Sequence, residues 1–251
     1  MIINHALRIA INDAVAIVGA GGKTSLMFAL AKALPKPVCL TTTTRLALAE
    51  GQGALNHLMF SEFFNQGYPF EDTLPNLVTN PLENNQIKWL GLSLNQAEQL
   101  ISFCRKENVS CLIEADGARH LSLKAPAEWE PVIPHQVSKV IVVVGLSAIG
   151  KPLIEQHVFR VEQFSKLTGL SVGDTIQFDH VLRMLQHPEG GLKGIPPGCK
   201  AAVVFNQRDA YSLKSEELDL IQRSLHDHYF TAILSSLRDD PVHCDVIFEH
   251  E

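Results

Sequence analysis

The chain has 251 residues, of which 46% are apolar, and a formal net charge of −6. This composition supports a sizeable buried core and excludes a disordered or fibrous protein. The acidic balance argues against broad nonspecific binding of nucleic acid, whereas a small anionic ligand held by a few lysines and arginines is compatible with it.

The N-terminal region indicates neither a signal peptide nor a membrane anchor. Arg8 and Asp13 interrupt the first apolar stretch, and no apolar run reaches membrane-spanning length. The five cysteines are odd in number and show no C-x-x-C spacing: Cys39, Cys104, Cys111, Cys199 and Cys244. They are typical of reduced, buried thiols, and we expect a cytoplasmic protein with no membrane partner.

Short apolar, β-branched runs alternate with helical patterns along the chain. The expected strands are Val15–Val18, Val38–Thr42, Cys111–Ala115, Val140–Val144, Ala201–Phe205 and Phe230–Leu234. The expected helices are Lys23–Leu34, Asn95–Lys106, Val158–Thr168 and Ser215–His228. Continuously apolar strands are covered on both faces, so the pattern predicts a three-layer α/β fold, in which helices cover both faces of a mainly parallel sheet.

Residues 49–91 lack a sustained period. We expect a single domain over residues 1–251, with this segment as an inserted elaboration over the sheet. Within it, Leu77–Thr79 and Ile87–Leu90 are typical of a short hairpin.

The first strand is followed by a glycine-rich turn that opens a helix, Gly19-Ala20-Gly21-Gly22-Lys23-Thr24-Ser25. Glycines let backbone N–H groups turn toward one point, and the helix N-terminus adds partial positive charge. A lysine in this position reaches the terminal phosphates of a nucleotide, and the following threonine holds Mg²⁺ through its hydroxyl. The turn therefore predicts a phosphate-binding loop.

Two departures narrow this interpretation. Ile17 stands where the common phosphate loop has its first glycine, so the turn is tighter. Thr24 stands where a dinucleotide-binding fingerprint has its third glycine, which disfavours that alternative. A glycine turn that only packs a helix on a strand remains the structural alternative.

Two carboxylates follow the third expected strand, in Glu114-Ala115-Asp116-Gly117. Ligands of open α/β sheets bind at the carboxyl ends of the strands. We expect Asp116 to act on the magnesium side, directly or through water, and Glu114 to orient or deprotonate the attacking water, although these roles are exchangeable. An acidic turn exposed to solvent is the alternative.

Arginines near the strand ends offer charge for phosphoryl transfer. Arg45 follows the run Thr41-Thr42-Thr43-Thr44, in which one threonine can contact the metal or the γ-phosphate, unless Thr44 only caps a helix. Arg119 and Lys124 lie in a proline-bounded loop that can hold a second substrate.

The fifth expected strand ends in Asn206-Gln207-Arg208-Asp209. This run approximates the Asn-Lys-x-Asp loop of guanine-nucleotide-binding proteins, with Gln207 in place of the lysine. Asp209 can accept both N–H donors on the edge of guanine, a contact that adenine does not offer. Because Asn-x-x-Asp is also an ordinary turn, the choice between ATP and GTP stays open.

The expected site is assembled from these motifs. Nucleotide-binding residues are Gly19, Ala20, Gly21, Gly22, Lys23, Thr24, Ser25, Asn206 and Asp209; metal ligands are Thr24 and Asp116; catalytic residues are Lys23, Glu114, Asp116, Arg45 and Arg119. This set predicts an NTP-binding protein and a Mg²⁺-dependent NTPase. The alternatives are a phosphotransferase or ligase-like enzyme, whose small acceptor is gripped by Arg45, Arg119 and Lys124, and a noncatalytic carrier of nucleotide or cofactor.

Several blocks together resemble one family: Val18–Ser25, Thr41–Arg45, Glu114–Arg119, Leu123–Pro126, Glu130–Pro134, Val144–Leu146 and Gly150–Leu153. The chain resembles the YqeC-type accessory proteins of selenium-dependent hydroxylases. That resemblance implies a phosphate-loop NTPase-like fold and a role in the maturation of selenium-dependent molybdenum hydroxylases. It also implies a molybdenum hydroxylase, or its cofactor, as a partner.

Overall fold

The structure is a computed structural model that describes residues 1–47, 55–65, 69–82, 88–239 and 242–250. In chain order its elements are α1 (Ile3–Ala6), β1 (Ala14–Gly19), α2 (Lys23–Ala33), β2 (Val38–Thr42), β3 (Arg45–Ala47), β4 (Asn56–Met59), α3 (Phe60–Phe63), β5 (Asn76–Leu82), β6 (Lys88–Leu90), α4 (Leu94–Lys106), β7 (Ser110–Glu114), β8 (Leu123–Lys124), β9 (Lys139–Gly145), a 3₁₀ turn (Leu146–Ala148), β10 (Val158–Phe159), α5 (Val161–Thr168), α6 (Phe178–Gln186), β11 (Lys200–Asn206), α7 (Ser215–Leu225), β12 (Thr231–Ser235) and β13 (Cys244–Glu249).

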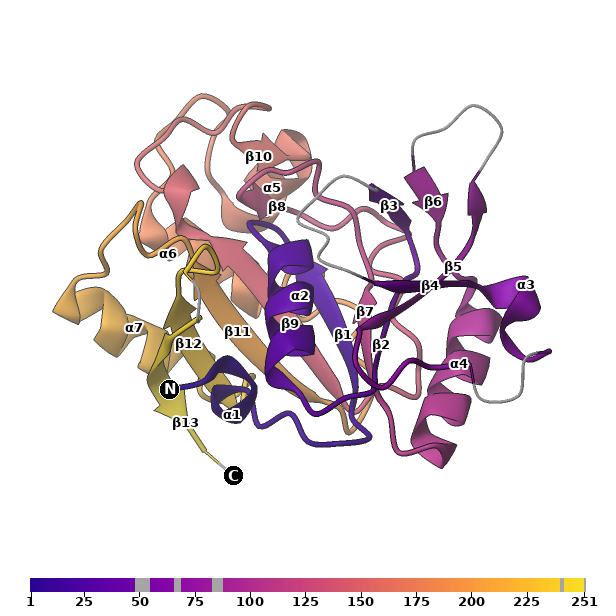
Figure 1. Cartoon of the computed structure of the whole chain (residues 1–251). Coiled ribbons are helices and arrows are strands. Elements are labelled where there is room, and N and C mark those ends of the chain that lie inside the picture. Colours follow the sequence, from indigo (N-terminus) through magenta and orange to yellow (C-terminus); the bar gives the residue numbers. More distant parts are fainter. Residues whose placement is uncertain (48–54, 66–68, 83–87, 240–241, 251) are drawn as a thin grey trace.

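The described residues form one large sheet of eleven strands, with helices packed around it (Figure 1). Its order is β13-β12-β11-β9-β1-β7-β2-β5-β6-β3, with β4 also paired to β5. The pairs from β12 through β11, β9, β1, β7 and β2 to β5 are all parallel, whereas β13 is antiparallel to β12. The expected mainly parallel sheet is confirmed, and β1 lies at its centre between β7 and β9.

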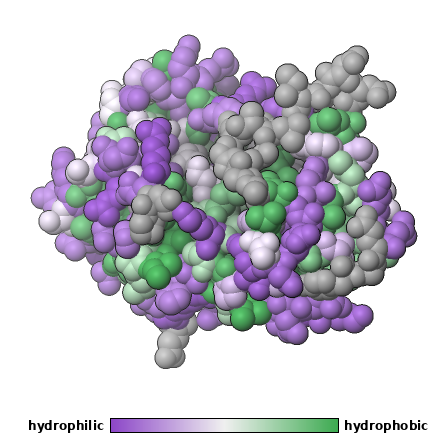
Figure 2. Space-filling view, in the orientation of Figure 1, coloured by the Kyte–Doolittle hydropathy of each residue, from purple (hydrophilic) through white to green (hydrophobic). Residues whose placement is uncertain are grey.

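Helices cover both faces of the sheet, which confirms the three-layer α/β arrangement. Side chains alternate along β1: Val15 and Ile17 pack in one core cluster with α1 and α2, while Ala16 and Val18 pack in the other with α4, α5, α6 and α7. Both clusters are buried, so β1 is apolar throughout. In the orientation of Figure 1, polar side chains dominate the visible surface and apolar ones form small groups (Figure 2).

The turn between β1 and α2 requires glycine where the backbone passes other strands. A Cβ at Gly19 would lie 2.3 Å from the carbonyl oxygen of Val143, and one at Gly21 would lie 2.4 Å from Cα of Gly145. Gly22 precedes the helix with a φ of +129°, a conformation that L side chains rarely adopt. Gly19 and Gly21 therefore let the turn lie against β9.

The structure differs from the sequence-based expectation at α5 and at α6. The predicted helix Val158–Thr168 begins at Val161, because Val158–Phe159 forms β10 beside β8 and Arg160 then adopts a φ of +65°. The sequence interpretation also missed α6, although its apolar residues have helical spacing and are buried. Among the described residues, no helix has both the length and the apolarity needed to cross a membrane.

The described part of residues 49–91 extends the sheet. Its strand β5 pairs in parallel with β2, through Cys39 opposite Asn76 and Leu40 opposite Leu77. The predicted hairpin is confirmed by the antiparallel pairing of β5 with β6, although Ile87 falls outside the described residues. Strands β4, β5 and β6 of this segment thus continue the sheet beyond β2, and its helix α3 packs against β4 and β5.

Candidate functional site

A pocket of about 820 Å³ opens at the carboxyl ends of the central strands. Among the residues predicted for the site, it is lined by Gly21, Gly22, Lys23, Thr24, Ser25, Arg45, Glu114, Arg119, Asn206 and Asp209. Gly19, Ala20 and Asp116 do not line it and contact a smaller cavity beneath the loop. The volume is in the range of small-molecule sites, and the topology brings motifs from four strand ends to one place.

The pocket is basic although the chain is acidic. Among the described residues, its lining contains six lysines and arginines, Lys23, Arg45, Lys88, Arg119, Arg160 and Arg238, against three acids, Glu114, Glu130 and Asp209. The chain as a whole has a formal charge of −6. This local excess of positive charge favours an anionic ligand.

The amides of the glycine-rich turn divide into two groups. The N–H groups of Gly19, Ala20 and Gly21 donate to Asp116 Oδ2 at 3.0 Å, Val143 O at 2.9 Å and Leu121 O at 2.9 Å. The first helical bond of α2 is donated by Leu26. Helix geometry thus leaves the amides of residues 23–25, rather than those of residues 19–21, for an anion at the pocket.

Lys23 lies at the pocket floor between acidic and backbone oxygens. Its Nζ donates to Gly19 O at 2.9 Å and lies 3.2 Å from Asp116 Oδ1 and 3.9 Å from Glu114 Oε1. The side chain is only 5% exposed. These oxygens compensate the buried ammonium charge and fix its position beside the first turn of α2.

Glu114, rather than Asp116, is the acid beside Thr24. The hydroxyl of Thr24 donates to Glu114 Oε2 at 2.7 Å, and both residues line the pocket. A hydroxyl and a carboxylate side by side are hard oxygen ligands of the kind that Mg²⁺ prefers. Of the two acids whose roles the sequence left exchangeable, Glu114 is therefore the one that contacts Thr24 at the pocket.

Asp116 belongs to a buried charge network, which we define as Lys23, Asp116, Lys124, Glu130 and Arg160. Lys124 Nζ donates to Asp116 Oδ2 at 2.8 Å, to the carbonyl of residue 117 at 2.8 Å and to Glu130 Oε2 at 2.6 Å. Arg160 Nη1 donates to Glu130 Oε2 at 2.7 Å. The ammonium of Lys124 therefore donates within the network. Lys124 does not line the pocket, so it is not placed to bind the acceptor of a phosphotransferase there.

The network also changes the acidity of Glu130. Burial by itself would raise the pKa of Glu130, but the hydrogen bonds and positive charges of Arg160 and Lys124 outweigh burial and lower it. Glu130 is 8% exposed and remains charged between two cations. The network thus holds the proline-bounded loop against the end of β7.

Asn206 braces the glycine-rich turn between β1 and α2. Its Nδ2 donates to Gly21 O at 2.6 Å, and its Oδ1 accepts from Leu237 N at 3.0 Å. Both ends of the amide are thus engaged by the backbone. Asp209 is exposed on the turn that follows β11 and lines the pocket. The two residues predicted together for the nucleotide base therefore lie in different environments.

Most hydroxyls of the threonine run at the end of β2 donate hydrogen bonds to backbone carbonyl groups. The hydroxyls of Thr41, Thr42 and Thr43 donate to the carbonyl oxygens of residues 78, 114 and 132. Arg45 is exposed at the start of β3 and lines the pocket. Of this motif, Thr43, Thr44 and Arg45 reach the pocket.

A second basic group lies around Phe159. The guanidinium of Arg119 is 4.9 Å from the ring centroid of Phe159, and that of Arg160 is 4.2 Å from it. Trp129, which also lines the pocket, is 74% exposed. Sequence reasoning missed Phe159, Arg160 and Trp129 as site residues, because isolated residues in loops form no motif.

The comparisons with known proteins agree on one family. The family model described as "YqeC protein" matches residues 15–162. The chain is also 31% identical over 239 residues to a protein of Escherichia coli (strain K12) named "Uncharacterized protein YqeC", a match that covers 90% of this chain and 88% of that protein. No solved structure matches the chain.

Proposed function

The chain belongs to the YqeC protein family, and we propose that it binds a nucleoside triphosphate with Mg²⁺ and hydrolyses it. One observation carries this proposal: the N-terminus of α2, Lys23 and the Thr24–Glu114 pair meet in one basic pocket. Helix amides and a lysine suit phosphates, while the hydroxyl and carboxylate suit the metal ion.

The proposed roles follow the contacts in the pocket. The amides of residues 23–25 and the ammonium of Lys23 hold the β- and γ-phosphates. Thr24 and Glu114 place Mg²⁺, directly or through water. Arg45 and Arg119, both exposed at the pocket, neutralise charge that develops in phosphoryl transfer.

Asp116 receives a different role from the one expected from sequence. It is 2% exposed, lies outside the pocket lining and accepts from Gly19 N and Lys124 Nζ. We therefore assign it to positioning of the phosphate loop and Lys23, and Glu114 to the metal side.

The biological role that we propose rests on the resemblance to the YqeC-type accessory proteins of selenium-dependent hydroxylases, and not on the pocket. We propose that nucleotide hydrolysis drives a conformational step in the maturation of selenium-dependent molybdenum hydroxylases in the cytoplasm. The partner is then a molybdenum hydroxylase or its cofactor. Co-purification with a tagged hydroxylase, with and without Mg²⁺-nucleotide, tests this step.

A phosphotransferase is the second candidate, and the group around Phe159 favours it. Arg119, Arg160 and the exposed ring of Trp129 offer charge and a flat surface beside the proposed phosphate site. Nucleotide turnover that is negligible alone but rises with a small acceptor, and yields a phosphorylated product, identifies this reaction. Phosphate release without acceptor identifies the NTPase.

The binding proposal is tested by thermal unfolding of the wild type and of Lys23→Ala, each with Mg²⁺ and ATP or GTP. A ligand at 100 times its Kd stabilises the native state by about 2.7 kcal/mol. We expect that stabilisation for the wild type and its loss in Lys23→Ala. The matched control is Lys166→Ala, an exposed lysine of α5 outside the pocket lining, which retains the shift. Absence of a shift with either nucleotide would reject the proposal.

A further inference from the structure

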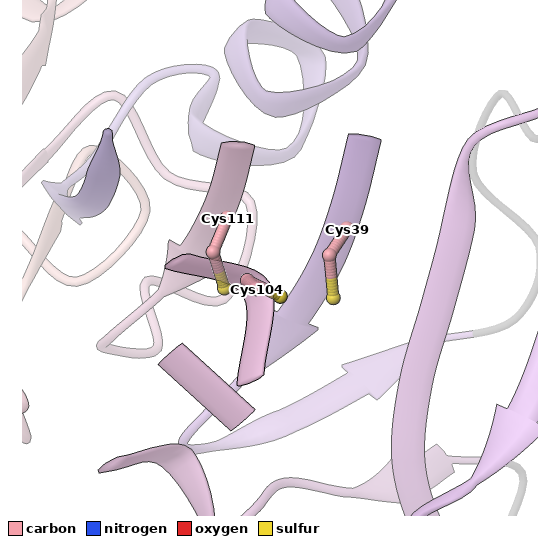
Figure 3. Close-up of side chains that lie close together, drawn as sticks. All are labelled: Cys39, Cys104 and Cys111. Carbon is pink, nitrogen blue, oxygen red and sulfur yellow. The ribbon is translucent and has the colours of Figure 1, made fainter. Parts of the chain in front are cut away.

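Three cysteines from different elements meet in the core (Figure 3). Cys39 of β2 and Cys111 of β7 are register partners on adjacent parallel strands. Cys104 of α4 lies over the same face of the sheet, and the three Sγ atoms lie within 4.8 Å of one another. Their positions in the chain show no metal-binding spacing, so the sequence alone does not indicate this cluster.

The cluster is separate from the pocket. Cys39 and Cys111 lie near the beginning of their strands, whereas Thr42 and Glu114 end them. Cys111 is three residues before Glu114, which corresponds to about 10 Å along a strand. The cluster and the pocket are therefore independent sites.

The spacing of the sulfurs suits a trigonal metal complex. Metal–thiolate bonds of about 2.3 Å place three sulfurs about 4.0 Å apart around a central ion. The observed limit of 4.8 Å requires only side-chain adjustments below 1 Å. Among the described residues, no histidine or carboxylate joins this group, so the donor set consists of sulfur alone. Sulfur donors select soft metals such as Cu(I).

The cluster is sealed from solvent. Cys39, Cys104 and Cys111 are at most 1% exposed and belong to an apolar core cluster. Each sulfur binds a metal ion as a thiolate. Structural Zn²⁺ sites almost always have four ligands, whereas this group offers three among the described residues, so the donor set favours Cu(I).

We propose that Cys39, Cys104 and Cys111 form a buried binding site for one Cu(I) ion. The ion joins α4 to β2 and β7 and is acquired as the chain folds, because the sulfurs are sealed from solvent afterwards. A ligand that binds only the native state raises the thermal unfolding temperature.

The test refolds the reduced full chain under anaerobic conditions with Cu(I) and removes loose metal with a Cu(I) chelator. We expect one copper per chain in the wild type, with thiolate-to-copper charge-transfer absorption and a raised Tm. Cys104→Ala loses all three signals. Cys244→Ala is the matched control, because Cys244 is also buried but its Sγ contacts the carbonyl of residue 1 outside the cluster, and it retains them.

A wild-type chain that holds no more copper than Cys104→Ala overturns the proposal. If Cys104→Ala fails to fold without metal, X-ray absorption of the copper-loaded wild type decides. Three sulfur neighbours at about 2.3 Å support the site, and nitrogen or oxygen neighbours overturn it.

Discussion

The hydroxyl of Thr24 donates to Glu114 Oε2 at 2.7 Å and so joins the first turn of α2 to the end of β7, 90 residues further along the chain. A threonine hydroxyl that donates to a carboxylate keeps its lone pairs for a metal ion. The carboxylate, in turn, can bind the same ion directly or through its water. This single contact therefore places the proposed Mg²⁺ position between the first turn of α2 and the end of β7.

Glu114→Gln is expected to weaken the Mg²⁺ dependence of nucleotide binding. Glutamine keeps the shape and can still accept from Thr24, but it removes the negative charge that attracts the cation. We expect at least a tenfold higher Mg²⁺ concentration at half-saturation, a change of about 1.4 kcal/mol, measured by titration of Mg²⁺ at fixed nucleotide. An unchanged titration curve would remove Glu114 from the metal site.

Asp116→Asn is expected to act mainly on folding stability. The change leaves Lys23 and Lys124 without their shared carboxylate in a buried place, and loss of one partner of such a pair costs about 3–5 kcal/mol. Urea unfolding followed by circular dichroism measures this loss. Glu128→Gln, an exposed acid of the same loop, is the control and should unfold like the wild type.

Asp209→Ala and Asn206→Ala are expected to separate base recognition from loop positioning. Asp209 is exposed at the pocket, so its removal should abolish a GTP preference and leave ATP binding unchanged. Asn206 holds Gly21 O and Leu237 N, so its removal should weaken both nucleotides alike. Thermal shifts with GTP and ATP report both effects, and a GTP shift that survives Asp209→Ala would contradict guanine recognition.

Glu130 predicts a loss of stability in acid. Its pKa in the folded chain is lowered from the ordinary value of 4.5, because Arg160 and Lys124 outweigh the effect of burial. Such a group stabilises the fold above its unfolded pKa, and this contribution is lost as the pH falls from there through the lower folded pKa. The unfolding free energy of Glu130→Gln should therefore depend less steeply on pH below 4.5 than that of the wild type. An equal pH dependence of the unfolding free energy in Glu130→Gln and in the wild type would contradict this role of Glu130.

The parts of the candidate site that lie in contiguous motifs could be predicted from the sequence. The contacts between segments far apart in the chain could not. Lys23, Thr24 and Glu114 were predicted because each stands in a contiguous motif at a strand end. The division of labour between Glu114 and Asp116 was not predictable, because it depends on Lys124 reaching back to Asp116 from β8. Arg160 was not predicted as a site residue because its position at the pocket also depends on a contact between distant segments, the pairing of β10 with β8.

Strands with continuous apolar runs were predictable. Element boundaries that depend on the backbone angle of a single residue were not. Six buried strands follow from hydrophobicity alone. In contrast, the positive φ of Arg160 ends β10, so that α5 begins only at Val161. No residue type in the segment 158–161 indicates this backbone conformation. The parallel pairing of β5 with β2 likewise depends on a partner that lies far away in the chain.

The brace formed by Asn206 has a consequence for the order of folding. Its bond to Gly21 spans 185 residues, and its bond to the amide of Leu237 involves a still later part of the chain. Contacts of such long sequence separation form late, since the loop-closure entropy must be overcome first. During synthesis the glycine-rich turn leaves the ribosome long before the residues that fix its shape. The pocket is therefore complete only after Asn206 and Leu237 have been synthesised and have reached the glycine-rich turn.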